Sequence, residues 1–395
     1  MRAIEQRKQS KKLSLRAMTK WFGGVGYLLL LIKYSFWQVG MLVRGQKNRS
    51  LDVSSTSIRD CTHQQKEQLL RDLPNSVDCL KRGYQNKCSI TQATKCPLST
   101  WLHQFYYNNT SSEPFLAINV GCNKGFDAVQ LLRMGSNNAS VKTRDWGTGL
   151  KQAGSVTAAD TFVAIGVCQQ ESVTDVPVSQ SVPRQAQVHC LEPLPPTVGA
   201  LRQANHHTKY QGLVIAHTAV SSRSGKVLFP TSRVAVGEHG EVQVGTENMG
   251  IDTCSKIAGK NCQSVPLTTL DAYTGRLQPD RVHVLLIDVE GWDYDVLLGG
   301  SRTLVRTEYI EFEYNWKGGW FQKRRKNSLQ TAITYLQHMD FVCYWAGVGK
   351  LWRITQCWLD HFGGPFWSNV ACVNTRLNSE LANQMEALFL ETLHG

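Results

Sequence analysis

The sequence predicts an α/β fold built on a mostly parallel sheet. Over residues 113–395, apolar runs of strand length alternate with helix-like stretches, which is typical of a parallel sheet that helices cover on both faces. One predicted strand runs into a glycine turn at residues 120–125, and two others end on the acids Glu192 and Asp288. Because ligands of such sheets bind beyond the carboxyl ends of the strands, we expect these three segments to meet at one site.

The alternation predicts a doubly wound sheet of seven strands. Runs of β-branched, aromatic and other apolar residues predict strands at residues 115–120, 187–192, 212–219, 283–288, 309–314, 341–345 and 369–373. The segments between them predict helices at residues 126–134, 197–204, 294–298 and 329–339.

Two stretches interrupt this alternation. Residues 136–186 are rich in Ser, Gly, Asn and Gln, and they separate the glycine turn from Glu192 by far more than the about 20 residues of a dinucleotide-binding unit. We interpret them as an insertion with a strand of its own around residues 162–168. Residues 225–228 and 241–244 resemble a polar excursion or hairpin.

The net charge of +12 is concentrated near the amino terminus. Residues 1–49 hold 11 of the 43 Lys and Arg residues and only one of the 31 acidic residues, so the remainder is nearly neutral. Proteins that bind nucleic acid through a basic face carry that charge along a groove or helix of the domain. The distribution therefore argues against a nucleic-acid partner.

A single transmembrane helix is predicted at residues 21–43, after a basic tail at residues 1–20. The segment would be about 34 Å long as a helix, which is enough for a hydrocarbon core of about 30 Å. Seven basic residues precede it and three follow closely, which favours a cytoplasmic tail and a body across the membrane. Lys33 near its middle would cost about 2.5–3.5 kcal/mol, so an amphipathic or transit segment is the alternative.

A stem with a cysteine cluster is predicted at residues 44–112. Its cysteines are Cys61, Cys79, Cys88 and Cys96. No C-x-x-C pair occurs in the chain, so disulfides within the stem are favoured over a zinc site. Farther along, Cys254 and Cys262 could close a small loop.

Glycosylation triplets agree with a lumenal body. Asn-x-Ser/Thr triplets, which are modified in the secretory pathway, begin at Asn48, Asn108, Asn109 and Asn138. We expect a single-pass type II membrane protein of the Golgi or endoplasmic reticulum, with residues 113–395 as the lumenal domain.

The glycine turn and Glu192 have the features of a cofactor site. Gly121 and Gly125 let the backbone approach a ligand where a side chain would stand in the way. The chain has neither a phosphate-binding Gly-Lys-Ser/Thr loop nor a three-glycine dinucleotide pattern, which argues against a nucleoside triphosphatase and a simple dehydrogenase. Glu192 ends a strand, where a carboxylate can accept both hydrogen bonds of a ribose diol. A nucleoside-cofactor enzyme is therefore predicted.

Acids also mark the ends of the fourth and fifth predicted strands, at residues 283–288 and 309–314. Asp288 and Glu290 close the most apolar strand of the chain and, two residues apart, can point the same way. Glu313 stands at the end of the following strand. Paired acids at the mouth of a crevice can orient a substrate, take a proton or hold a divalent ion, or one of them only caps the next helix. We assign no metal ligands.

Six short motifs occur in one order between residues 115 and 315. They occupy residues 119–125, 191–195, 219–225, 269–271, 286–291 and 296–300. This series resembles the FkbM-type methyltransferases, although that family's first loop usually begins with an acid where this chain has Asn119. The resemblance implies a class I methyltransferase fold that binds S-adenosylmethionine.

The resemblance also implies roles for individual residues. The cofactor-binding residues would be Asn119, Gly121, Asn123, Gly125 and Glu192, with the Gly121 loop near the methionine part of the cofactor and Glu192 on its ribose. The reaction would be O-methylation of a hydroxyl on a glycan or small-molecule acceptor.

Methyl transfer to a hydroxyl requires an oriented acceptor and a base. Holding the acceptor oxygen in line with the methyl group can supply up to about 7–11 kcal/mol of the barrier reduction, and the base takes the hydroxyl proton. Asp288 is the first candidate for the base, followed by Glu290 and Glu313, with His217 as a remote candidate.

Two other function classes fit parts of the sequence. A basic tail, an anchor, a stem and a lumenal domain also describe Golgi glycosyltransferases, and Asp293 and Asp295 match their metal-binding D-x-D pattern. These acids fall where a helix should begin, and acids favour the first helical turn. The other alternative is a non-enzymatic lumenal scaffold that has kept the fold.

Overall fold

The computed structural model describes residues 60–73, 99–109, 111–153, 175–179, 183–231, 250–256, 261–314, 320, 328–347, 349–364 and 368–394. These residues belong to one contact unit that begins at Ile58. The predicted tail and the predicted anchor at residues 21–43 lie outside the described residues, as does the predicted strand around residues 162–168. Within the described ranges, no helix has the length and apolar character needed to cross a membrane.

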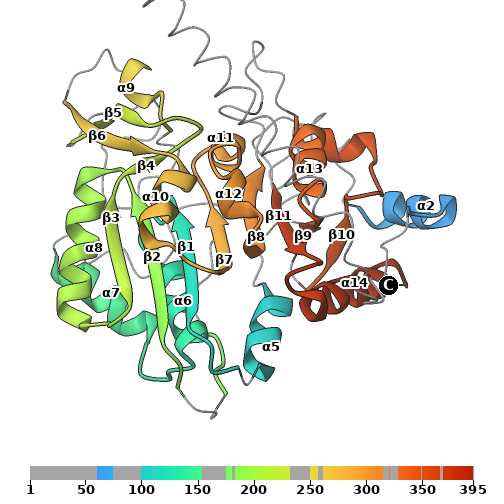
Figure 1. Ribbon diagram of the computed structural model, residues 1–395, viewed down its shortest axis with the longest axis horizontal. Helices are drawn as coiled ribbons and strands as arrows, with labels where there is room; N and C mark the ends of the chain where they lie inside the picture. Colours follow the sequence, from blue (N-terminus) through green and yellow to red (C-terminus); the bar gives the residue numbers. More distant parts are fainter. Residues whose placement is uncertain are drawn as a thin grey trace, which may run out of the picture. The chain divides into compact units, whose positions relative to one another are not determined.

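In the described part of the chain, eight strands form the main sheet in the order β10-β9-β11-β8-β7-β1-β2-β3 (Figure 1). The strands are β1 (Phe115–Val120), β2 (Ala186–Glu192), β3 (Leu213–His217), β7 (Val282–Ile287), β8 (Thr307–Tyr314), β9 (Phe341–Ala346), β10 (Leu351–Arg353) and β11 (Ser368–Asn374). The predicted strands coincide with seven of these, within one to two residues at most ends, and β10 was missed.

The sheet is mostly parallel, as predicted, but the predicted number of seven strands is wrong and two of the eight described strands, β10 and β11, run antiparallel to the rest. Strands β3, β2, β1, β7 and β8 are parallel, whereas β11 runs antiparallel to both of its neighbours, β8 and β9. A short turn region also returns β10 antiparallel to β9. An apolar run predicts a buried strand but not the direction in which it runs. The sequence pattern therefore could not predict which strands are antiparallel.

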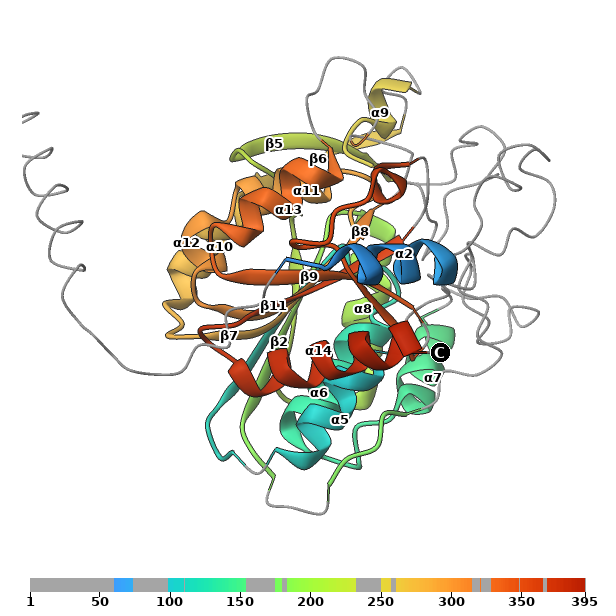
Figure 2. The same ribbon diagram turned by 90° about the vertical axis from the view of Figure 1, so that its right-hand side faces the viewer.

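Helices cover both faces of this sheet, as predicted (Figure 2). One face carries α5 (Thr100–Asn108), α6 (Phe126–Ser136), α7 (Thr143–Gln152), α8 (Pro195–Thr208) and α14 (Ser379–His394). The other face carries α10 (Leu270–Leu277), α11 (Asp293–Leu298), α12 (Ser301–Leu304) and α13 (Leu329–Gln337). The remaining described helical elements are α2 (His63–Asp72), α9 (Thr253–Lys256) and the 3-10 helix η3 (Asp360–Gly363).

Helix α6 fits tightly against the strand that precedes it. It begins after Gly125, carries Asp127 in its first turn, and ends at Asn137 in the left-handed conformation, which is a common helix stop. A Cβ atom on Gly135 would lie 2.1 Å from a ring carbon of Phe115, so glycine permits the close approach of helix and strand. This packing holds β1 and α6 together on either side of the glycine turn that connects them.

A second, three-stranded sheet lies at the carboxyl ends of β2 and β3 (Figure 1). It contains β4 (Ala219–Val220), β5 (Gly225–Pro230) and β6 (Cys262–Thr268) in the order β4-β6-β5. The predicted hairpin at residues 225–228 is thus part of β5, but its antiparallel partner is β6, and residues 241–244 lie outside the described part. The predicted pairing of Cys254 with Cys262 is confirmed.

Segments assigned to the stem contact the α/β unit. Helices α2 and α5 both pack against α14, the last described helix of the chain. Cys61 pairs with Cys357, so the prediction that Cys61 forms a disulfide within the stem is wrong. Sequence spacing failed here because the partner lies 296 residues away and only the tertiary fold brings it near. Cys79, Cys88 and Cys96 lie outside the described residues.

Candidate functional site

The first glycine of the predicted turn lies where three strands meet. Gly121 has a φ of +78°, and its N–H donates to the carbonyl of Leu191 at 2.8 Å. A Cβ atom at this position would stand 1.8 Å from the carbonyl oxygen of Asp288. Only glycine therefore fits, and the turn that ends β1 contacts the ends of β2 and β7 directly.

The remainder of the turn is held by α7, which lies inside the segment predicted as an insertion. Gly125 has a φ of +75°, and a Cβ atom there would lie 3.0 Å from a ring carbon of Trp146. The Trp146 Nε1–H donates to the carbonyl of Lys124 at 2.8 Å. The buried indole therefore supports the loop from the helix side.

Glu192 is the last residue of β2 and is buried. Its Oε2 accepts from the N–H of Asn123 at 3.0 Å, and its Oε1 accepts from the N–H of Leu194 at 2.8 Å. Each oxygen keeps capacity for a further hydrogen bond. Burial raises the pKa of Glu192 to about 7; these two hydrogen bonds oppose the shift, and the Asp288 charge adds to it.

Two buried polar atoms beside this carboxylate have no hydrogen-bond partner among the described residues. They are Nδ2 of Asn119, at the end of β1, and Oδ1 of Asn123, in the turn. Asn119 is only 3% exposed, and buried polar groups normally have a partner. One of these atoms is a donor and the other an acceptor, so both would suit a polar ligand at this edge.

Asp288 follows β7 directly, and its N–H donates to the carbonyl of Val120 at 2.9 Å. The side chain is exposed to solvent. The surrounding protein nevertheless removes water from the carboxylate and raises the pKa of Asp288 to about 7, and the charges of Glu290 and Asp127 add to the shift.

Glu290 and Glu313 lie at the same edge of the sheet as Asp288. Glu290 is half-buried in the turn after β7, with a φ of +58°. Strands β7 and β8 are parallel with Ile287 opposite Phe312, so Asp288 and Glu313 each stand one position farther along. Glu313 is buried at the end of β8, opposite Asn369 of β11.

Asp127 belongs to this group of acids, although we did not predict it. It lies in the first turn of α6, its charge acts on Asp288, and the surrounding protein raises its pKa. An acid in the first turn of a helix is sufficiently explained by the helix dipole. Nothing in the sequence therefore indicated that Asp127 would lie near the end of β7.

The D-x-D pattern is buried in the first turn of α11. Asp293 is fully buried, and Asp295 is buried and accepts from the Ser222 hydroxyl at 3.2 Å. Burial raises the pKa of Asp293 well above its usual value, and the charge of Asp288 adds to the shift. In the described part of the chain, no group of three or more His, Cys, Asp or Glu could hold a metal ion. These positions do not support a glycosyltransferase metal site.

His217 is tied to the backbone after Glu192. Its Nε2 lies 3.1 Å from the carbonyl oxygen of Pro193, at the end of β3. This contact gives the imidazole a structural role in holding the turn that follows β2, which accords with its rank as a remote candidate.

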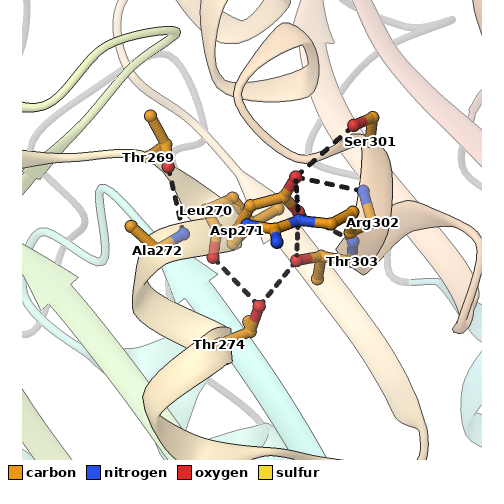
Figure 3. A network of polar contacts seen from close by, with 8 residues as sticks. All are labelled: Thr269, Leu270, Asp271, Ala272, Thr274, Ser301, Arg302 and Thr303. Atoms are coloured by element: carbon orange, nitrogen blue, oxygen red, sulfur yellow. Dashed lines mark hydrogen bonds and ion pairs between the residues drawn. The ribbon is translucent and has the colours of Figure 1, made fainter. Parts of the chain in front are cut away.

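The motif at residues 269–271 forms a structural junction with the start of α12 rather than a ligand site (Figure 3). Thr269 caps α10 by accepting from the N–H of Ala272 at 3.0 Å. Asp271, two residues later, accepts from the N–H groups of Arg302 and Thr303 at 3.1 and 2.8 Å, at the start of α12. Partial burial raises the pKa of Asp271, but these and further hydrogen bonds outweigh it and lower the pKa overall.

Comparison with known proteins identifies the family of this region. Residues 172–343 match the family described as Methyltransferase FkbM domain, and no curated protein matches the chain. The matched range contains Glu192, Asp288, Glu290 and Glu313. The Gly121 turn precedes it but is joined to it by the pairing of β1 with β2 and β7. The chain therefore contains a methyltransferase FkbM domain, as its motifs predicted.

Proposed function

We propose that this chain is an S-adenosylmethionine-dependent O-methyltransferase acting on a hydroxyl of a glycan or other lumenal acceptor. The main support is the meeting of the Gly121 turn, Glu192 and Asp288 at the carboxyl ends of β1, β2 and β7. This is the edge at which open α/β sheets bind nucleoside cofactors, and here it is part of a methyltransferase FkbM domain.

The residues at this edge fit the proposed cofactor. Glu192 has acceptor capacity for the ribose hydroxyls, and Asn119 and Asn123 each present a buried polar atom without a partner in the described part. The side-chain-free backbone of Gly121 permits a ligand to approach the turn. When bound, S-adenosylmethionine supplies an activated methyl group. The protein then needs only to bind the cofactor, orient the acceptor hydroxyl and accept the proton of that hydroxyl.

Asp288 is the proposed proton acceptor. Its pKa of about 7 lies near neutral pH, where a general base is both ionised and basic enough to act. The carboxylate would accept the proton that the acceptor hydroxyl gives up, while bound S-adenosylmethionine would supply the methyl group and leave as the thioether. Glu290, in the turn after β7, and Glu313, in β8, lie at the same edge of the sheet and would orient the acceptor.

Methyl-labelled S-adenosylmethionine with a panel of glycans tests this function. Glu192→Ala should raise the Kd for the cofactor at least about tenfold. Asp288→Ala should keep cofactor binding and lower kcat by about 10²–10⁴-fold. Asp280→Ala, an exposed acid before the amino end of β7, is the matched control and should behave as the wild type. Absence of cofactor binding by the wild type would refute the function.

We further propose that the domain lies in the lumen of the Golgi or endoplasmic reticulum behind an anchor at residues 21–43. All eight cysteines in the described ranges are paired, and disulfides persist mainly in oxidising compartments. Asn138 is exposed in the connection between α6 and α7. Peptide mass spectrometry after expression in eukaryotic cells should find a glycan on Asn138, which Asn138→Gln removes. An unmodified Asn138 would count against this location.

A further inference from the structure

A disulfide joins the glycine turn to the strand that carries Glu192. Cys122 follows Gly121 in the turn, Cys190 precedes Glu192 by two positions in β2, and the two are paired. Both side chains are buried, with 4% and 1% of their surface exposed. The bond therefore lies beneath the edge at which the cofactor is proposed to bind.

We propose that the Cys122–Cys190 disulfide is a positioning element that holds the Gly121–Gly125 turn in its cofactor-binding conformation. The inference rests on the proposed function, which it extends from the residues that contact the cofactor to the bond that places them.

The disulfide has little to add to the alignment of the strands themselves. Strands β1 and β2 are already paired in parallel up to Val120 and Leu191, and Asn119 stands opposite Cys190. Hydrogen bonds of that ladder fix the register without a covalent link. The turn begins where the ladder stops, so the tether acts on the turn.

The turn needs such restraint because its backbone is unusual. Gly121, Asn123 and Gly125 all have positive φ values, and glycine in particular has many other conformations open to it. The described shape of the turn is held by hydrogen bonds that include one from the Gly125 N–H to the carbonyl of Cys122 and one from the Asn123 N–H to Glu192. A bond from Cys122, which lies between Gly121 and Asn123, reduces the ordering that cofactor binding would otherwise require.

The chain offers a matched control in a second buried disulfide. Cys343 and Cys372 stand opposite each other on β9 and β11 and are paired. Both are fully buried, but they lie in strands beyond β8, away from the glycine turn. Removing this bond tests the general effect of losing a buried disulfide.

The full-length chain is compared as wild type, Cys122→Ala/Cys190→Ala and Cys343→Ala/Cys372→Ala. If the untethered turn keeps its shape in about a tenth of the molecules, the apparent Kd for S-adenosylmethionine rises about tenfold in the first variant. The KM for the cofactor rises in parallel, while kcat at saturating cofactor stays near the wild-type value. The control variant keeps the wild-type Kd and KM even where its unfolding temperature falls.

The possible outcomes distinguish a failure of the positioning role from a failure of the proposed function. A wild type without affinity for S-adenosylmethionine refutes the proposed function. A wild type that binds, together with a Cys122→Ala/Cys190→Ala variant of equal Kd, refutes only the positioning role, as does an equal loss in the control variant.

A second measurement covers the case in which the variant does not fold. The wild type is treated with a reductant under native conditions, and thiols are mapped by quenched alkylation at each time point. Cofactor binding should fall with the opening of Cys122–Cys190 and return on reoxidation. Binding that persists after this bond has opened overturns the proposal.

Discussion

At the scale of single residues, two carboxyl groups with pKa values of about 7 dominate the candidate site. Glu192 and Asp288 owe these values first to the removal of water by surrounding protein; the Asp288 charge adds to the shift of Glu192, and the charges of Glu290 and Asp127 add to that of Asp288. Glu192 could be predicted as a strand-end acid and Asp288 as the acid after an apolar strand. Their pKa values could not, because they depend on the packing of Asp127, Glu290 and the loop around them.

Cofactor affinity should depend on pH through Glu192. Its carboxylate accepts ribose hydroxyls better when ionised, so the Kd for S-adenosylmethionine should fall about tenfold between pH 6 and pH 8. Calorimetric titration across this range measures the effect. Glu192→Gln should bind more weakly at pH 8 and show a flatter profile, and a wild-type Kd that does not change with pH would contradict the prediction.

The stability of the cofactor-free protein should fall as pH rises, whereas its affinity for the cofactor should increase. The pKa of Glu192 rises from 4.5 to about 7 on folding, so the folded state holds more protons than the unfolded state in this window. Stability is therefore lost as pH rises through it, by up to about 3 kcal/mol. Urea unfolding at pH 5 and pH 8 should show this loss, and Glu192→Gln should reduce it. An unchanged slope in the variant would assign the effect to other groups.

At the scale of elements, the Asp271 junction gives a structural role to the motif at residues 269–271 and to Gly300 of the motif at residues 296–300. Asp271 of α10 accepts from N–H groups at the start of α12, and a Cβ atom on Gly300 would lie 2.8 Å from the Leu270 side chain. Leu270, Asp271 and Gly300 thus serve to seat α12 against α10.

Asp271→Ala should destabilise the fold by about 1–3 kcal/mol, because several donors at the start of α12 lose their acceptor. Urea unfolding at pH 7 measures this change. The pKa of Asp271 is lowered in the folded state, so its contribution is present above its unfolded pKa and is lost as pH falls through the folded value. Asp280→Ala, at an exposed acid, is the control, and an equal loss there would contradict the capping role.

Helices and strands that carry an apolar run could be predicted from the sequence. Those whose burial depends on contacts with distant residues could not. β1 was predicted with its observed bounds, and α6 with its observed start. Helix α7 was missed because its sequence is rich in Gly and polar residues, and Trp146 shows its role only in contact with Gly125. Strand β6 was also missed, because its exposed polar residues do not form the apolar run by which a strand is predicted.

At the scale of the whole described unit, the chain links its early and late segments. The Cys61–Cys357 disulfide spans 296 residues, and α2 and α5 pack against α14. The sulfur atoms of this disulfide also accept from the buried Arg353 guanidinium. Sequence composition had suggested a separate stem, because a segment without apolar periodicity gives no sign of its packing partner.

Removal of the Cys61–Cys357 disulfide should lower stability by roughly 2–5 kcal/mol. The chain-entropy account gives a larger loss for this long loop than for Cys254–Cys262, which closes a loop of sequence separation 8. Unfolding temperatures of the Cys61→Ala/Cys357→Ala and Cys254→Ala/Cys262→Ala variants test the order. Equal losses would show that unfolded-state entropy is not the main contribution.

The convergence of Gly121, Glu192 and Asp288 was predicted from topology alone, because parallel strands present their carboxyl ends at one edge. The structure adds a mechanical consequence at position 121. The Gly121 backbone packs directly against the peptide group of residue 288, and the Asp288 N–H donates to the residue before Gly121. A change in the shape of the turn would therefore be felt at the residue that carries the proposed proton acceptor.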